Sequence, residues 1–172
     1  NRHVPTDRPP GLSALSKAYS PQLVAGPMEG PARLLPQLKR PTKLECERLA
    51  TGFALIVVGL FKKVVIADRL AIYVNEVYGH PAQYHGLAVI LATYLFAFQI
   101  YCDFSGYSDI AIGSARMFGY DLMQNFDRPY FSRSVREFWT RWHISLSSWF
   151  RDYLYIPLGG NRVAPWRNKL NL

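Results

Sequence analysis

The stretch SVREFWTRWHISLSSWFRDYLYIPLGGN, residues 134–161, decides how the rest of the chain is interpreted. Ser134 and Glu137 have the spacing of a capping box, in which each residue satisfies a backbone N–H at the start of a helix. No glycine or proline follows until Pro157. The pattern therefore predicts one helix over residues 134–155.

This predicted helix mixes aromatic and cationic side chains in a way that does not suit water. Whichever face turned inward, aromatic surface would remain exposed. At a membrane interface the mixture is favourable, because Trp and Tyr lie at headgroup depth and Arg extends outward. The aromatic residues are Phe138, Trp139, Trp142, Trp149, Phe150, Tyr153 and Tyr155, and the cations are Arg136, Arg141 and Arg151.

His143 falls in the middle of the predicted helix. At helical spacing it shares a face with Trp139, Leu146 and Phe150. A single histidine among aromatic side chains is consistent with a hydrogen-bonded core residue. Such a histidine is more often a core residue than a catalyst, but a desolvated neutral imidazole could also act as a general base and take a proton from an attacking hydroxyl. Both interpretations remain open at this stage.

Apolar runs elsewhere predict membrane helices. Residues 86–102 carry no charge and would form a helix about 26 Å long, near the lower limit for a span. A buried helix of a soluble protein is the alternative. The earlier apolar run is interrupted by Lys62 and Lys63, which are costly at a membrane centre. That element is therefore predicted to be interfacial or buried in protein, with a bend at Gly59.

The predicted fold class is all-α. We expect a multi-helix integral membrane domain with interfacial and embedded helices joined by Pro-rich loops. Small residues after residue 103 favour close helix packing. The expected helices cover residues 43–66, 67–78, 86–101, 104–119 and 134–155.

Composition narrows the class of partner. The formal charge of +8 would suggest nucleic acid in a soluble protein, but the basic residues border apolar stretches, which is typical of lipid-facing charge. We therefore expect membrane lipid and no nucleic acid. Cys46 and Cys102 lack metal-ligand spacing, and His80 and His85 are expected at the surface, so no metal site is predicted.

Two carboxylates are candidate supporting groups. Asp103 and Asp109 lie six residues apart, a spacing that does not put both squarely on one helix face. Paired carboxylates can perform acid–base catalysis. Structural pairing of these aspartates with Arg116 or with the Arg141 region is the preferred interpretation.

Four collinear stretches resemble the membrane-bound O-acyltransferase family. They are REFWTRWHISLSSWFRDYLYIPLGGNR (136–162), PQLVAGP (21–27), GLFKKVVIADRLA (59–71) and DFSGYSDIAIG (103–113). The resemblance is greatest to the bacterial branch that O-acetylates alginate and similar exopolysaccharides. Residues 21–172 would then form part of the family's membrane domain. Residues 1–20, which are polar and Pro-rich where the family has apolar sequence, are expected to be a poorly ordered or non-native extension.

The resemblance implies an activity and a site. It implies acyl transfer, with acetyl-CoA or another activated acyl compound as co-substrate and no bound cofactor, onto hydroxyls of an exported polysaccharide. His143 would be one of two active-site histidines. The second, usually taken as the family's catalytic base, lies in a Trp-His-Gly context that is absent from this sequence. Arg141, Trp142, Asp103 and Asp109 are candidate supporting residues.

Other implied properties concern location and partners. The family resemblance implies a multi-pass protein of the bacterial inner membrane, working with periplasmic or membrane partner proteins. The alternatives are a non-catalytic scaffold or transport element of an export complex, in which His143 is structural. Acyl transfer to another envelope polymer, such as teichoic acid, is a further alternative.

Overall fold

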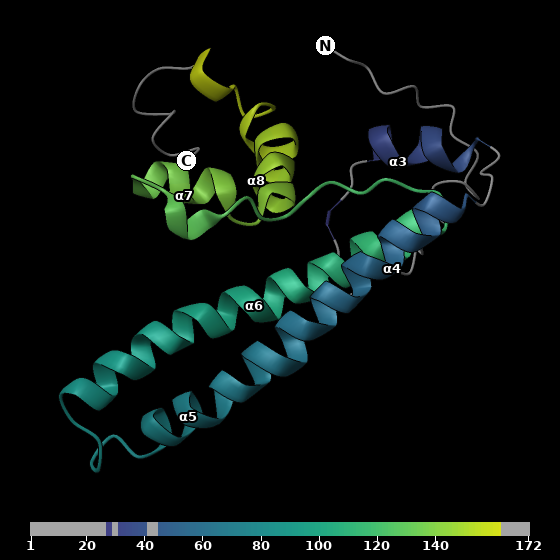
Figure 1. Ribbon diagram of the computed structural model, residues 1–172. Coiled ribbons are helices and arrows are strands. Elements are labelled where there is room, and N and C mark those ends of the chain that lie inside the picture. Colours follow the sequence, from purple (N-terminus) through teal and green to yellow (C-terminus); the bar gives the residue numbers. More distant parts are fainter. Residues whose placement is uncertain (1–26, 29–30, 41–44, 163–172) are drawn as a thin grey trace.

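The computed structural model describes residues 27–28, 31–40 and 45–162. No β-strand occurs among these residues, and the one β-bridge joins Phe126 to Trp142. The predicted all-α class is confirmed. The elements labelled in Figure 1 and those between them are α3 (Pro31–Leu38), α4 (Cys46–Leu60), η1 (Phe61–Ala67), α5 (Asp68–Gly79), α6 (Leu87–Met117), η2 (Pro129–Phe131), α7 (Val135–Arg141), α8 (Ile144–Phe150), η3 (Arg151–Tyr155) and η4 (Gly160–Arg162).

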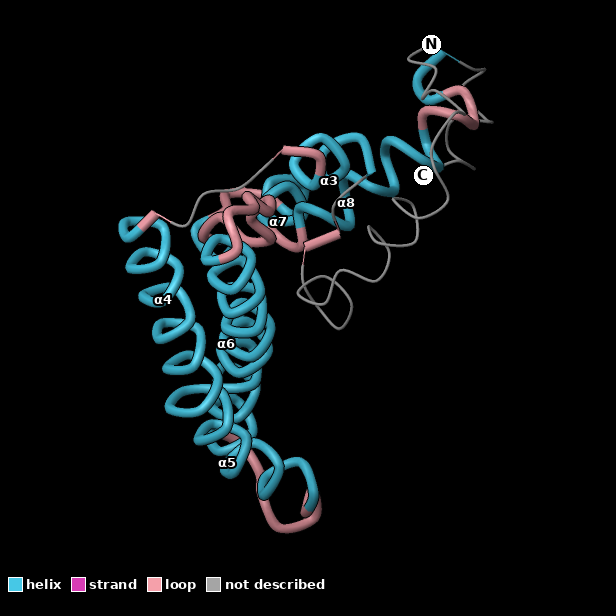
Figure 2. The backbone as a smooth tube through the Cα atoms, turned by 90° about the vertical axis from the view of Figure 1, so that its right-hand side faces the viewer, coloured by secondary structure: helices cyan, strands magenta, loops and turns pink. Residues whose placement is uncertain are grey.

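A long helical hairpin dominates the structure. One arm runs without interruption through α4, η1 and α5, and the other arm is α6, which returns antiparallel beside it (Figures 1 and 2). The boundary expected between two helices near residue 66 is therefore not a break in the helix. The backbone only changes there from π-helical to α-helical winding. The seven residues of η1 are π-helical, and its C-cap Asp68 donates its backbone N–H to the Lys63 carbonyl.

The expected break between helices 86–101 and 104–119 is wrong. α6 continues through Asp103 as a single helix of 31 residues, from Leu87 to Met117. An aspartate in mid-helix is tolerated here because its carboxylate is paired with Lys63 across the hairpin, at 2.6 Å. The sequence contains the charge of Asp103, but it does not show that Lys63 is the partner that stabilises this charge.

Four glycines bring the two arms into close contact. A Cβ atom added to Gly106 would lie 2.7 Å from the Gly59 carbonyl oxygen, and one added to Gly113 would lie 2.5 Å from that of Gly52. Both distances are shorter than side chains allow, so the helices meet backbone to backbone. The predicted close packing through small residues after residue 103 is thus confirmed at Gly106 and Gly113. Gly59 is a contact residue, and the change of winding begins after it, at Phe61.

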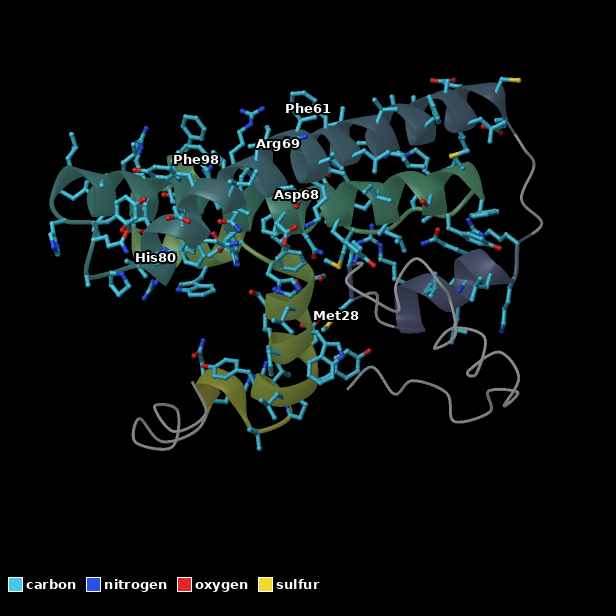
Figure 3. All side chains as sticks on the ribbon, turned by 90° about the horizontal axis from the view of Figure 1, so that it is seen from below. Met28, Phe61, Asp68, Arg69, His80 and Phe98 are labelled. Carbon is cyan, nitrogen blue, oxygen red and sulfur yellow. The ribbon has the colours of Figure 1, made fainter. Side chains whose placement is uncertain are left out.

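Both arms are long and apolar enough to cross a membrane. The first covers Cys46–Gly79, with 34 residues, and the second Leu87–Met117, with 31. Only 11% of the most apolar window of each arm is buried within the structure, so their apolar side chains point outward. Phe61, for example, projects from the outer side of the hairpin (Figure 3). The expectation that the first arm is interfacial or buried in protein stays a prediction, because this exposure refers to the described residues alone.

The shorter helices lie on one side of the hairpin, with α7 and α8 beside the middle of α6, where Phe104 contacts His143, and α3 at the end away from the 80–86 loop (Figures 1 and 2). α3 packs there through Leu34 against Ile112 and Ala115 of α6 and Leu122 beyond it. The residues expected to form an N-terminal extension, 1–20, lie outside the described residues, as do the first two residues of the helix expected over 43–66. The structure begins that helix at Cys46.

The predicted N-cap at Ser134 is confirmed, although Glu137 accepts from the residue before the cap and not from Ser134 itself. The backbone N–H of Glu137 donates to the Ser134 hydroxyl at 3.1 Å, and a Glu137 carboxylate oxygen accepts from the backbone N–H of Arg133 at 2.8 Å. The helix it starts is short, however. α7 ends at Arg141 and α8 begins at Ile144, so the predicted single helix over 134–155 is wrong.

Candidate functional site

Backbone hydrogen bonds on both sides of His143 break the predicted helix. The Asp127 N–H donates to the Arg141 carbonyl at 3.0 Å, and the Ile144 N–H donates to the Asn125 carbonyl at 2.9 Å. Together they attach the 125–127 segment to the chain just before and just after His143. These long-range bonds replace helical ones, and sequence periodicity carries no signal for them.

The break puts His143 in a left-handed backbone conformation, with φ 46° and ψ 54°. Histidine is one of the residue types that adopt this region more readily than most, although glycine is the usual occupant. The expected helical face of His143 with Trp139, Leu146 and Phe150 is therefore wrong. Instead, His143 lies at the junction of α7 and α8, where its position is set by backbone bonds to a neighbouring segment.

The His143 ring is partly enclosed. The ring of Phe104, from α6, packs edge-on against it with centroids 4.7 Å apart. Burial lowers the pKa of the imidazole below its usual value of 6.5. The neutral form is thus favoured at neutral pH, as expected from the sequence. A neutral imidazole has a nitrogen lone pair and can accept a proton.

Trp142 belongs to an aromatic cluster that joins α6 to the α7 region. Its ring lies 5.0 Å from that of Phe126 and 5.4 Å from that of Phe138, and Tyr101 and Tyr130 complete the cluster. The Tyr130 hydroxyl donates to the Ala97 carbonyl at 2.6 Å. Burial raises the pKa of this phenol, so the donor keeps its proton. The cluster holds the junction that carries His143 against α6.

The other predicted supporting residues are engaged in ion pairs. Arg141 contacts Glu137 at 2.7 Å within α7. Asp109 contacts Lys62 at 2.6 Å, and Asp103 contacts Lys63 at the same distance. The expected pairing of the aspartates with Arg116 or the Arg141 region is wrong. Their partners are the two lysines that interrupt the first apolar run.

Asn125 and Ser145 form a buried polar pair that sequence reasoning missed. The Ser145 hydroxyl donates to the Asn125 side-chain oxygen at 2.5 Å and accepts from the backbone N–H of Met28 at 3.0 Å. Both side chains are almost completely buried, and Met28 lies beside α8 (Figure 3). The pair is 20 residues apart in the chain, so no local pattern could have revealed it. It connects Met28, the 125–127 segment and the start of α8 at the His143 junction.

A cavity of about 590 Å³ lies between the arms of the hairpin and the segment after α6. His143 is not among its lining residues, but Asn125 and Ile144 are. The other polar side chains that line it include Arg33, Lys62, Ser105, Ser108, Asp109 and Arg116. The cavity therefore lies next to the His143 junction, and Asp109 is part of its lining.

His80 and His85 are exposed at the hairpin loop, as expected. Within the described ranges no group of three or more His, Cys, Asp or Glu side chains is placed to hold a metal ion.

Comparison with known proteins identifies relatives along nearly the whole chain. The model of MBOAT, the membrane-bound O-acyltransferase family, matches residues 16–170. The chain is 44% identical over 155 residues to the probable alginate O-acetylase AlgI of Pseudomonas aeruginosa, an alignment that covers 90% of this chain and 29% of that protein. It is 41% identical over 152 residues to the peptidoglycan O-acetyltransferase of Helicobacter pylori, covering 87% of this chain and 29% of the relative.

A more distant relative is the teichoic acid D-alanyltransferase of Bacillus subtilis. The identity is 32% over 155 residues, covering 88% of this chain and 38% of the relative. The chain thus spans about a third of the length of the curated relatives it matches.

Proposed function

The chain belongs to the membrane-bound O-acyltransferase family, and on this basis we propose that its protein transfers an acetyl or other acyl group to hydroxyls of an exported polysaccharide such as alginate. The observation that carries the proposal is the 44% identity to a probable alginate O-acetylase over 90% of this chain. The matched region contains His143 and the helices that hold it.

His143 is proposed to take part directly in the transfer. As the acceptor hydroxyl oxygen attacks the acyl carbonyl carbon, the imidazole takes the hydroxyl proton. The new ester bond forms while the bond from the carbonyl to the leaving group of the donor breaks. The proton then passes from the imidazole to that leaving group. The lowered pKa of His143 supports this role, because the base must be neutral when the hydroxyl arrives.

The four supporting candidates are assigned different roles. Trp142 and its aromatic cluster would exclude water from the junction. Arg141, paired with Glu137, would hold the end of α7 in place beside His143. Asp103 and Asp109 are proposed to act as ion-pair partners of Lys63 and Lys62, and not as acid–base groups, because each carboxylate is 2.6 Å from an ammonium.

We assign the acyl donor, the location and the partners on the same basis. The donor would be a co-substrate, acetyl-CoA or another activated acyl compound, and no bound cofactor is required. The protein would be a multi-pass protein of the bacterial inner membrane, as the two candidate spans support. Membrane lipid, the acceptor polysaccharide and other proteins of the acetylation machinery would be its partners, and nucleic acid would not.

Peptidoglycan is a second candidate acceptor, favoured by the 41% identity to a peptidoglycan O-acetyltransferase. Both acceptors present sugar hydroxyls outside the cytoplasm. The teichoic acid relative, at 32% identity, supports this alternative less strongly.

A gene replacement tests the proposal. The full-length protein would be expressed in an alginate-producing bacterium that lacks its own O-acetylase, and ester-linked acetyl groups would be measured in alginate and in peptidoglycan by NMR. Restored acetylation of alginate is the expected result. Acetylation of peptidoglycan alone would select the second acceptor. No ester in either polymer, with the protein present in the membrane, would contradict acyl transfer to these polysaccharides.

A further inference from the structure

Cationic side chains are distributed unequally between the two ends of the hairpin. Between Arg69 and Arg116 the sequence contains no Lys or Arg, so the 80–86 loop and the ends of the arms that flank it carry none. The other end of the hairpin carries several, from α3 and the segment after it, from α4 and from α6. These residues, which we call the basic end, are Arg33, Lys39, Arg40, Arg48 and Arg116.

Side-chain contacts attach α3 to both arms at the basic end. The Arg48 guanidinium, on α4, contacts the carboxylate of Asp121, beyond α6, at 2.6 Å. The Gln37 side chain, on α3, donates to the Asp121 backbone carbonyl at 3.1 Å and accepts from the Asp121 N–H at 2.8 Å. Lys39 and Arg40 follow α3 directly. They are therefore held beside the point where α4 begins and α6 ends (Figures 1 and 3).

The basic end has positive charge that the described residues do not compensate. Lys39 and Arg40 are exposed, and neither makes an ion pair with any residue in the described ranges. The lysines in the middle of the first arm differ, because each contacts an aspartate of α6. At the opposite end, Glu76 is the one Asp, Glu, Lys or Arg in the sequence from 70 to 86. The two ends of the hairpin thus offer opposite charges to their surroundings.

The length of the arms brings both ends of the hairpin to the membrane surfaces. At the rise of a helix, arms of 34 and 31 residues are about 45–50 Å long. The hydrocarbon core of a bilayer is only roughly 30 Å thick. Segments next to membrane helices carry more Lys and Arg on the cytoplasmic side. Anionic lipids of the cytoplasmic leaflet attract such cations, so a basic end and an end without cations indicate an orientation.

We propose that the basic end contacts the headgroups of anionic phospholipids in the cytoplasmic leaflet through Lys39 and Arg40, and that the 80–86 loop faces the periplasm. This assignment rests on the proposed function, because it takes the protein to be in the inner membrane. Each arm then crosses the bilayer once, and the chain enters α4 and leaves α6 on the cytoplasmic side. A reversed hairpin would put the uncompensated cations in the periplasm and leave the cytoplasmic loop without any Lys or Arg.

Cysteine labelling from each side of the membrane tests the orientation. Cys46 is exposed at the start of α4, and Gln83 is exposed in the loop. Two full-length variants would each keep a single cysteine, either the native Cys46 or Gln83→Cys. In spheroplasts, a membrane-impermeant maleimide is expected to label Gln83→Cys and not Cys46, and in inside-out vesicles the preference should reverse. The opposite pattern, labelling of both sites from one side, or labelling of neither until detergent is added would overturn the assignment.

The lipid preference of the basic end tests the partner. The purified full-length protein, with a dye on Cys46, would be placed in nanodiscs of phosphatidylcholine and phosphatidylglycerol. One of the two lipids would carry a nitroxide quencher on its acyl chain near the headgroup. Phosphatidylglycerol is expected to quench the dye more strongly. Lys39→Gln combined with Arg40→Gln should lower the association constant of phosphatidylglycerol relative to phosphatidylcholine about fivefold or more.

Arg133→Gln combined with Arg136→Gln is the matched control, because it removes two exposed cations away from the basic end and should leave this ratio unchanged. Equal quenching by the two lipids in the parent protein, or an unchanged ratio in the Lys39 and Arg40 variant, would overturn the lipid contact. Neither experiment measures acyl transfer. The expected labelling in a protein that acetylates no polysaccharide would contradict the proposed function alone, and reversed labelling in an active enzyme would contradict the orientation alone.

Discussion

The Lys62 ammonium lies 2.6 Å from the Asp109 carboxylate, and the two residues belong to opposite arms of the hairpin. Their side chains are only 27% and 22% exposed. The next residue in the chain, Lys63, makes a similar contact with Asp103 of the other arm. The charges that seemed to argue against membrane insertion of the first arm are therefore compensated by charges in the second. The pairing links the arms in a single register, next to the contact between Gly59 and Gly106.

Removing one charge of the Lys62–Asp109 pair should destabilise the protein more than removing both charges. Asp109→Asn leaves the Lys62 charge without its partner and should cost about 3 kcal/mol or more. Lys62→Met combined with Asp109→Leu should recover most of that loss, because no charge remains buried. Thermal unfolding of the full-length protein in detergent measures both. Arg151→Gln, which breaks an exposed pair with Asp152, should cost under about 1 kcal/mol. A double variant no more stable than Asp109→Asn would contradict this account.

The glycine contacts predict a position-dependent effect of one methyl group. Gly106→Ala places a Cβ 2.7 Å from the Gly59 carbonyl oxygen, so the arms must separate. Overpacking of this kind costs roughly 1–3 kcal/mol. Gly79→Ala is the matched control, because a Cβ there meets nothing within 4 Å. Equal thermal stability of the two variants would show that the helices do not pack through these glycines.

Ser145→Ala should loosen the His143 junction. The change removes the hydroxyl that joins Asn125 to the backbone of Met28 and leaves buried groups unpaired, at a cost of about 1–3 kcal/mol. We expect lower thermal stability and a reduced kcat for acyl transfer. Ser147→Ala, an exposed change on the same helix, should affect neither. If Ser145→Ala matches the wild type in both measurements, the buried pair does not support the junction.

The lowered pKa of His143 predicts the pH dependence of transfer. A general base acts in its neutral form, so activity falls as pH drops through its pKa. Because burial holds that pKa below 6.5, the acid limb of the kcat/KM profile should lie below pH 6.5. The corresponding contribution to folding stability is present above the ordinary pKa and is lost as pH falls through the lowered value. An acid limb above pH 7 would assign the titration to another group.

Sequence patterns predicted the helical class, the Ser134 cap and the small residues of α6 because each depends on residues close together in the chain. They did not predict that Gly52 and Gly59 are the partners of Gly113 and Gly106. They did not predict the partners of Asp103 and Asp109. Those partners, Lys63 and Lys62, lie 40 or more residues away, and their pairing depends on how the arms align.

The sequence motif predicted that His143 belongs to the site, but helical periodicity predicted the wrong structural position for it. Helical periodicity puts His143 in mid-helix, but backbone bonds from Asn125 and Asp127 end one helix and begin another around it. Backbone hydrogen bonds between distant segments do not change the hydrophobic periodicity of either segment, so the sequence pattern does not show them. The cavity was likewise beyond prediction, since its lining comes from α3, both arms and the loop after α6.

The most direct test of the account is the acyl-transfer rate of His143→Gln in the full-length protein. Glutamine keeps similar size and hydrogen bonding but cannot act as a base. His85→Gln, at the exposed hairpin loop, is the control. With equal protein levels in the membrane, we predict a loss of more than about 100-fold in His143→Gln and none in the control. Near-normal transfer by His143→Gln would contradict a direct catalytic role and leave His143 as a structural residue.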